Sequence, residues 1–354
     1  MTIDHLGGWL SNYTHESLGY VSALEGFVFL SGFMFASVYL KDATRPRRLF
    51  ARVARRAWTI YRHQLVLLLL LPLLMWSAAH RAALADWVQP YFTAPATYFG
   101  LALVLIHQPV YMDILPMYLL FLLVSPVLLI ALQEGWTAAV LLASGSLWLG
   151  AQYFRPIVST VALCAGCRHA PTTPGAWQLV WVAGLYCGYR YRTRRLVVPD
   201  ANPLVLVTCI AIGGLLFLSR HQWIALGFDV DRAAAIGHLA WLRMLNFGVL
   251  TALVVALLRR LSPESGISWL ALLGRASLQV FAFHVVLVYV LLPYHEQVVK
   301  VGGRTGDLAL TLAVVASLTI PALVYRRYAA AHRPPLLPSL EILNPDGAVP
   351  ERVI

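Results

Sequence analysis

The fold class of this chain is decided by one stretch, Leu24-Glu25-Gly26-Phe27-Val28-Phe29-Leu30-Ser31-Gly32-Phe33. The stretch belongs to an apolar run that contains a single carboxylate, Glu25, and it leads directly into a basic segment. A carboxylate in the middle of a membrane-spanning helix costs roughly 2.5–3.5 kcal/mol to insert, and crossing the bilayer does not require one. The stretch therefore predicts a membrane helix in which the carboxylate of Glu25 marks a candidate functional site.

The composition of the whole chain agrees with a membrane protein. Hydrophobic residues make up 59% of the 354 residues, charged residues make up only 12%, and the mean hydropathy is +0.70. Soluble domains have about twice this charged fraction. The net charge of +11 comes from Lys and Arg residues that cluster between apolar runs. This distribution is typical of membrane topology and argues against a nucleic-acid partner.

Nine apolar runs are long enough to cross a bilayer, since ~20 helical residues span a ~30 Å hydrocarbon core. They are residues 21–40, 57–78, 110–132, 136–153, 176–190, 203–219, 240–258, 268–292 and 306–326. The stretch 95–108 is short and bounded by Pro, so we expect an interfacial or re-entrant segment there. The sequence thus predicts an all-α, polytopic transmembrane helix bundle over residues 1–332, and a Pro-rich cytoplasmic tail over 333–354.

The basic residues predict the orientation of this bundle. Positively charged loops stay on the cytoplasmic side of a membrane, and the segment 41–56 is the most basic loop of the chain. If that loop is cytoplasmic, only about ten residues precede the loop Ser11–Tyr20. About ten helical residues extend only ~15 Å, which is too short to cross the bilayer. We therefore expect the first membrane helix to be truncated, with its start before Met1, and no cleavable signal peptide.

In this predicted topology, the acid–base groups and the cationic groups lie toward opposite sides of the membrane. Asp4, His5 and Glu25 fall in the outer half, as do Asp113 and His284. The inner face and inner half receive a second set, which consists of Arg52, Arg55, Arg56, Arg62, His63 and Arg275. The pattern indicates proton-transfer chemistry toward one compartment and anion binding toward the other.

Each of these residues also has a purely structural explanation. Glu25 can hydrogen-bond a neighbouring helix, and His284 can be a satisfied core residue. Asp113 can cap the helix that follows it. The inner arginines follow in part from the positive-inside rule, and His63 can extend to the inner interface.

Other motifs give weaker signals. Cys164 and Cys167 form a CxxC motif followed by His169. We expect the two cysteines to form a disulfide or to remain as inert thiols. A zinc site would need a further ligand nearby, and Arg168 stands where a haem-attachment motif requires His. No phosphate-binding glycine loop is present. We expect neither a metal nor a resident cofactor.

Four segments together resemble the OpgC (MdoC) family of membrane succinyltransferases of osmoregulated periplasmic glucans. They are Ala23–Gly32, with Glu25 ahead of Phe-Val-Phe-Leu-Ser-Gly; the run Arg52-x-x-Arg55-Arg56 toward Tyr61–His63; Tyr111-Met112-Asp113-Ile114-Leu115-Pro116; and Leu273–Phe281, closing on His284. They occur in the order of the family and extend from Asp4 to about Tyr289. OpgC proteins are similar in turn to the acyltransferase family 3 membrane enzymes, which move acyl groups from acyl-coenzyme A to sugars outside.

The resemblance implies roles for individual residues. His5 matches a His of the first helix, although the basic residue that precedes it in the wider family would fall before Met1. Glu25 matches the acidic position ahead of the Phe-rich segment, and His284 matches a His late in the fold. The coenzyme-associated Arg-x-x-Arg motif is matched by Arg52 and Arg55, and Arg56 and Arg275 are further candidates for the coenzyme.

The implied chemistry is O-acyl transfer, with succinyl as the expected acyl group. His5 would act as a general base, and Asp4 or Glu25 would hold its imidazole in one tautomer. The inner arginines would bind the phosphates of acyl-coenzyme A. Direct transfer and an acyl-histidine intermediate both remain open. The partners implied are acyl-CoA as donor, a periplasmic glycan as acceptor, the lipid bilayer of a bacterial inner membrane, and proteins of glucan synthesis.

Two other functions are compatible with the same residues. A transporter or permease for a small anion or a lipid-linked sugar would use the buried charges as its pathway. A catalytically inactive homologue would serve as a partner of a glycan synthase. The asymmetric placement of acid–base groups, and the lack of an evident inverted repeat, favour the acyltransferase.

Overall fold

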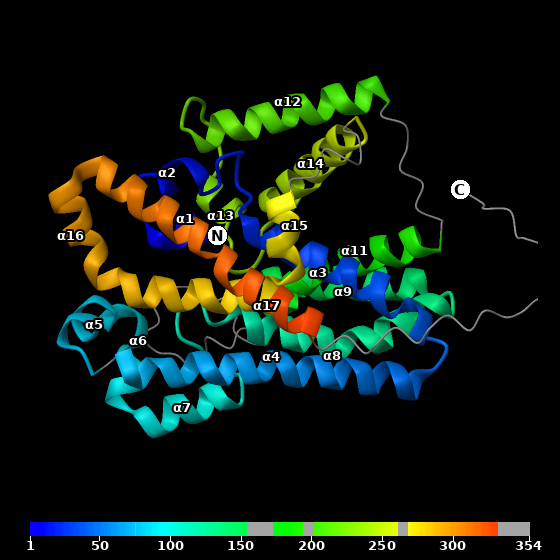
Figure 1. Cartoon of the computed structure of the whole chain (residues 1–354). Coiled ribbons are helices and arrows are strands. Elements are labelled where there is room, and N and C mark those ends of the chain that lie inside the picture. Colours follow the sequence, from blue (N-terminus) through cyan, green and yellow to red (C-terminus); the bar gives the residue numbers. More distant parts are fainter. Residues whose placement is uncertain (75, 154–172, 194–201, 261–267, 332–354) are drawn as a thin grey trace, which may run out of the picture.

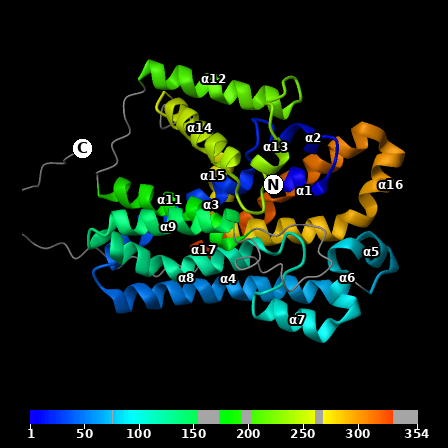
Figure 2. The same cartoon turned by 180° about the vertical axis from the view of Figure 1, so that it is seen from behind.

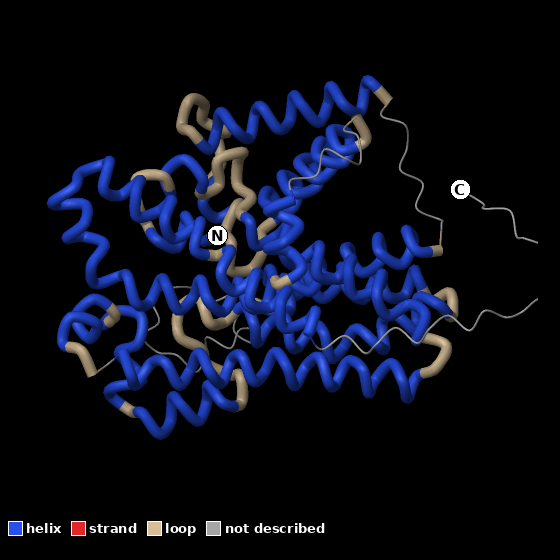
Figure 3. Tube along the Cα trace, viewed as in Figure 1, coloured by secondary structure: helices blue, strands red, loops and turns tan. Residues whose placement is uncertain are grey.

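The computed structural model describes residues 1–74, 76–153, 173–193, 202–260 and 268–331. These residues form helices joined by loops, with no strand among them (Figure 3). The all-α prediction is confirmed. The tail expected at 333–354 and the CxxC motif at Cys164 and Cys167 lie outside the described residues.

The helices fall into long and short classes. The long helices are α3 (Ala23–Tyr39), α4 (Pro46–Leu74), α8 (Ile114–Gln133), α9 (Thr137–Tyr153), α11 (Pro174–Arg192), α12 (Pro203–Arg220), α14 (Trp241–Leu258), α16 (Ser277–Ser317) and α17 (Thr319–Ala331). The short helices are α1 (Thr2–Leu6), α2 (Ser11–Thr14), η1 (Leu40–Asp42), α5 (Ala78–Ala83), α6 (Ala85–Thr93), α7 (Pro95–Leu103), α13 (Val230–Ala233) and α15 (Ser268–Arg275).

Within the described residues, six segments are helical, long and apolar enough to cross a membrane. They are Ala23–Asp42, Pro46–Leu74, Ile114–Gln133, Pro203–Arg220, Trp241–Leu258 and Ser277–Ala331. The expected spans 136–153 and 176–190 also form helices, α9 and α11, but they are not among the six. Helix α9 has 17 residues, which extend only ~25 Å, and α11 carries Arg190 and Arg192 in its last turn.

The first difference from prediction concerns α4, which was expected over 57–78 and begins at Pro46. Pro is favourable in the first turn of a helix, and the arginines that follow are good helix formers. Leu49, Val53 and Ala57 are buried at helical spacing along this basic turn. The helix therefore continues through the basic segment, with one apolar face against the bundle.

The second difference concerns the expected spans 268–292 and 306–326. The helix breaks at Ala276, so the first span is divided between α15 and α16. Helix α16 then continues to Ser317, but its backbone leaves the helical region at Gly303, at φ 56° and ψ −147°. A backbone with positive φ favours Gly at this position. Figures 1 and 2 show α16 turning back on itself toward α17.

The centre of the bundle is a close crossing of α3 and α11. Gly184 and Gly188 of α11 lie against the carbonyl groups of Phe29 and Phe33, and Gly32 of α3 lies against the carbonyl group of Trp181. A Cβ atom at any of these glycines would collide with backbone. Small residues permit this approach of two membrane helices, and the contact fixes α3 at the centre.

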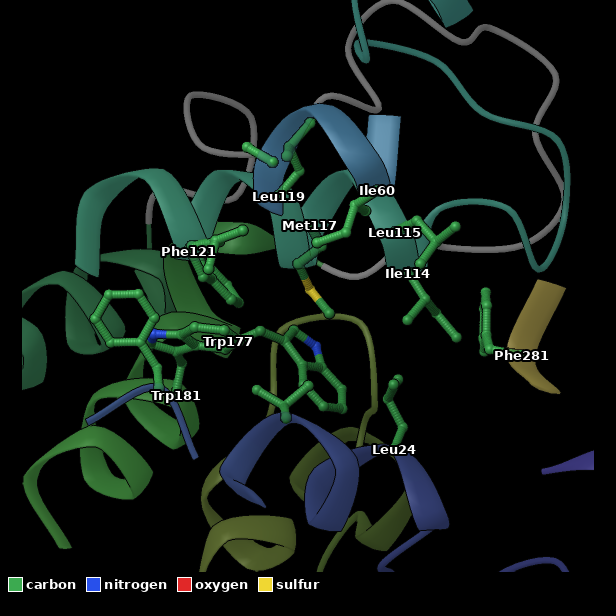
Figure 4. Close-up of a cluster of buried hydrophobic side chains, with 14 of the residues drawn as sticks. Leu24, Ile60, Ile114, Leu115, Met117, Leu119, Phe121, Trp177, Trp181 and Phe281 are labelled. Carbon is green, nitrogen blue, oxygen red and sulfur yellow. The ribbon is translucent and has the colours of Figure 1, made fainter. Parts of the chain in front are cut away.

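A large apolar core surrounds this crossing. Figure 4 shows side chains from α3, α4, α8, α11 and α16 converging on one another, among them Leu24, Ile60, Trp177 and Phe281. Trp177 and Trp181 are almost completely buried. The core brings α16, which carries His284, next to the helices that carry Glu25 and the basic segment.

Candidate functional site

Two histidines from opposite ends of the sequence meet in the structure. Nδ1 of His5, in α1, lies 3.0 Å from Nε2 of His284, in α16. His284 is buried, and Leu6 of α1 packs with Val288 and Val314 beside it. The structure thus brings together two residues that the sequence analysis selected separately.

The hydrogen bonds fix which ring nitrogens carry protons. Nδ1 of His284 lies 2.8 Å from the carbonyl oxygen of Phe281, which can only accept, so this nitrogen is the donor. In a neutral ring, Nε2 of His284 is then an acceptor, and Nδ1 of His5 donates to it. The proton-accepting nitrogen of His5 is consequently Nε2. This nitrogen has no hydrogen-bond partner among the described residues.

A tyrosine fixes the plane of the His5 ring. The rings of His5 and Tyr111 are stacked at 3.8 Å with an interplanar angle of 15°. Tyr111 lies in the loop before α8 at φ 64°, an uncommon backbone conformation for a residue with a side chain. Burial raises the pKa of Tyr111 above its usual value, so the phenol stays neutral. Strained residues of this kind are concentrated at functional sites.

A pair of Asp307 and His295, both in α16, holds the end of α1 in place. Asp307, buried in the second half of α16, accepts a hydrogen bond from the backbone N–H of Trp9 and lies 3.0 Å from Nε2 of His295. Gly8 lies directly against the Asp307 carboxylate, where a side chain would collide with it. These contacts keep α1, and with it His5, against α16.

Glu25 is completely buried and lies in a charged network that does not include His5. Its Oε1 accepts from Arg243 Nη1 at 2.7 Å, and its Oε2 accepts from the backbone N–H and hydroxyl of Ser22 at the start of α3. Arg243 also pairs with Glu16, and Arg220 lies 3.1 Å from the same carboxylate. Glu25 therefore makes the polar contact with a neighbouring helix that its structural explanation requires.

The other two acidic candidates, Asp4 and Asp113, make their contacts with other groups. Asp4 accepts a hydrogen bond of 2.5 Å from Thr14 Oγ1, in the segment that follows α1. Asp113 occupies the N-cap position of α8, but its side chain makes no capping hydrogen bond, so capping does not explain it. The Nδ1 nitrogen of His5, which such a carboxylate would hold, is instead within hydrogen-bond distance of His284.

Arg275 ends α15, whereas Arg52, Arg55 and Arg56 lie in the first part of α4, close to η1 and at the end of the bundle away from α1 (Figures 1 and 2). Asp42 is buried there and pairs with Arg52 and with Arg48, the latter at 3.0 Å. The guanidinium of Arg52 also lies over the ring of Tyr39, at 5.1 Å. Arg52 is thus a positioned cation whose charge is partly compensated.

The remaining basic candidates are less constrained. Arg55 and Arg275 are exposed, and Arg55 hydrogen-bonds only the carbonyl group of Ala51 within the described residues. Arg56 is half-buried and lies close enough to Tyr118 of α8 for the two groups to interact electrostatically. His63 contacts the carbonyl oxygen of Thr59 at 2.8 Å, within its own helix.

A series of aromatic contacts connects the histidine pair with the basic end. The ring of His284 contacts Phe281 at 5.1 Å, and the rings of Phe281 and Phe27 are 6.4 Å apart. The rings of Phe27 and Tyr118 are 6.3 Å apart, and Tyr118 interacts electrostatically with Arg56. The interior between the two candidate sites is therefore lined by aromatic rings.

A comparison with protein families now identifies the chain. A model of the OpgC protein family matches residues 1–330. The chain belongs to the OpgC family. Its membership, together with the membrane-length helices, indicates a membrane acyltransferase. No curated protein and no solved structure matches the chain.

Some polar residues of this OpgC protein were missed by sequence reasoning. Arg243, Glu16 and Asp307 were not selected as site residues. A membrane-embedded arginine needs a partner, which is the one signal that could have drawn attention to Arg243. Within the described residues of the OpgC chain, no cluster of His, Cys, Asp and Glu could hold a metal ion.

Proposed function

We propose that this protein transfers a succinyl group from cytoplasmic succinyl-coenzyme A to a hydroxyl group of an exported glucan in a bacterial inner membrane. OpgC membership supports the acyltransferase class. The observation that carries the proposal further is the pair of hydrogen bonds that leaves Nε2 of His5 as a proton acceptor. We also propose that the fold is related to the acyltransferase family 3 enzymes.

The chemical step follows from this tautomer. A sugar hydroxyl is a weak nucleophile, and its proton passes to Nε2 of His5 while its oxygen attacks the thioester carbonyl carbon. The C–S bond then breaks, the coenzyme thiolate leaves, and the proton on His5 is returned to it. While His5 is charged, its Nδ1–H donates to the neutral Nε2 of His284, and a charged donor strengthens that hydrogen bond.

The donor would reach this point from the basic end. The phosphates of coenzyme A require several cations, and the exposed Arg55 and the positioned Arg52 and Arg56 are candidates. The pantetheine arm is long and largely apolar. It would lie beside Tyr118, Phe27 and Phe281, whose rings lead to His284.

The test is an assay on the purified protein in sealed vesicles. Succinyl-coenzyme A labelled in the succinyl group is supplied on the side of the basic end, and a neutral glucan is supplied on the other side. We expect alkali-labile label on the glucan and free coenzyme A thiol in equal amounts. If no ester forms, and labelled succinate supplied in place of the thioester crosses the membrane, the transporter alternative would be supported instead.

A further inference from the structure

A polar cavity lies beside α1, the helix that carries His5. It has a volume of about 310 Å³ and is lined by Asp4, Ser11, Asn12, His15 and Arg220. Asp4 immediately precedes His5 in α1, and His15 is close enough to His5 for their charges to interact. The volume lies at the lower end of the range for ligand pockets, which is ~300–1,000 Å³.

The lining distinguishes this cavity from another cavity in the described part of the chain. That cavity, of about 520 Å³, lies between α4, α6 and α7 and is lined mainly by apolar residues, such as Leu71, Tyr91 and Phe99. The cavity beside His5 instead presents a hydroxyl, an amide, an imidazole, a carboxylate and a guanidinium. Such a set suits a ligand with many hydroxyl groups.

Three elements hold the walls of the cavity in place. Ser11 Oγ donates to the carbonyl oxygen of Gly8 at 2.6 Å, and Thr14 Oγ1 donates to Asp4. The following residue pair, His15 and Glu16, is anchored because Glu16 pairs with Arg220 of α12 and Arg243 of α14. The segment 11–16 is therefore fixed before any ligand binds, which lowers the entropic cost of binding.

Two side chains in this wall have no partner of their own. Those of Asn12 and His15 are exposed and make no hydrogen bond within the described residues. Their donors and acceptors are free for a ligand, and their truncation removes no hydrogen bond of the fold. The cation of the cavity, Arg220, is already paired with Glu16, and Asp4 adds a carboxylate. A neutral ligand is therefore favoured over an anionic one.

We propose that this cavity is the acceptor subsite and that it binds a neutral sugar unit of the glycan, so that one hydroxyl group of the sugar reaches His5. The proposal rests on the proposed function for the identity of the acceptor. The binding of a neutral oligosaccharide beside α1 and α2 can nevertheless be measured without any transfer.

The experiment measures two quantities in the full-length protein in lipid nanodiscs. The first is the Kd of a neutral glucose oligosaccharide without donor, and the second is the KM of the same acceptor in the transfer assay. We compare the wild type with Asn12→Ala, His15→Ala and the double variant. Each lost hydrogen bond should weaken binding by roughly 2- to 12-fold, and the Kd of acyl-coenzyme A should not change.

Gln297→Ala is the matched control, because Gln297 is an exposed amide on α16 outside the cavity. An unchanged oligosaccharide Kd in the double variant would overturn the subsite. Transfer with an unchanged acceptor KM in that variant would also reject the subsite while leaving the transferase function in place. Oligosaccharide binding that weakens in the variants without any transfer in the wild type would support the subsite and reject the proposed function.

Discussion

Charged residues are arranged differently at two ends of this bundle. The histidine end is the region around α1, with His5 and His284, and the basic end is the region around η1 and the start of α4. Around α1, the ionic groups are buried and partnered, as Glu25 with Arg243 and Asp307 with His295 are. Around the start of α4, the buried Asp42 compensates Arg48 and Arg52, while Arg47, Arg55 and Arg62 are exposed. One end is built from fixed pairs, and the other holds an excess of positive charge.

This difference matches two chemical demands. Proton transfer requires a base in one tautomer and one orientation, and buried hydrogen bonds supply both. Binding of a polyanion depends more on the number of available cations, which exposed arginines supply at small cost. The two ends can therefore be tested separately, because a change at one end should leave the property of the other intact.

The largest effect is expected for His5→Ala. Loss of a general base lowers the rate by ~10²–10⁴-fold, and the basic end should still bind acyl-coenzyme A with the wild-type Kd. The matched control is His63→Ala, because the ring of His63 contacts only its own helix within the described residues. Equal transfer rates for the two variants would contradict the assignment of His5. The measurement is succinyl transfer alongside donor binding.

The next effect concerns stability at the histidine end. Arg243→Gln removes the cation that Glu25 faces, and the loss of one member of a buried pair costs ~3–5 kcal/mol in the free energy of unfolding. Glu25→Gln in the same chain should recover part of this loss, because no buried carboxylate is left alone. Denaturation in detergent measures both variants.

The control for this stability test is Arg232→Gln, since Arg232 is exposed on the short α13. Its unfolding free energy should stay close to that of the wild type. A double variant less stable than Arg243→Gln alone would show that Glu25 has a stabilising role beyond this ion pair.

The all-α class and most of the membrane spans could be predicted from the sequence, because both depend on local hydropathy. The boundaries of α3, α8, α12 and α14 agree with the expected spans to within a few residues. The start of α4 at Pro46 was not predicted. Its first turns are basic and have low hydropathy, which is also typical of a loop, although one face is buried. The break at Ala276 was not predicted, since it divides one apolar run, whereas the turn at Gly303 falls between two expected spans.

The candidate site was predictable as a set of residues and less so as a set of pairs. His5 and His284 were both selected, but their mutual hydrogen bond depends on the packing of α1 against α16. The partner of Glu25 was not identified, because Arg243 is distant in sequence. Residue type and depth can be estimated from hydropathy and topology, whereas pairing requires the helix arrangement.

A smaller effect is expected for Arg55→Gln at the basic end. If this exposed arginine contacts a coenzyme phosphate, its loss removes one charge-assisted hydrogen bond, worth ~1.5–3 kcal/mol. The Kd of acyl-coenzyme A should rise about tenfold or more. The unfolding free energy should not change. Arg232→Gln again serves as the control. An unchanged donor Kd would mean that Arg55 only orients the chain in the membrane.

The smallest effect, and the one of opposite sign, is expected for Asp42→Asn. This change keeps the shape of a buried side chain but removes the charge that holds Arg48 and Arg52. Partly exposed ion pairs are worth ~0.2–1 kcal/mol each, so the freed arginines should tighten acyl-coenzyme A binding by only a few-fold, and less at high salt. Titration of the donor at two salt concentrations measures this gain. Weaker binding in Asp42→Asn would reverse the interpretation, because it would show that the carboxylate positions Arg52 for the donor rather than competing with it.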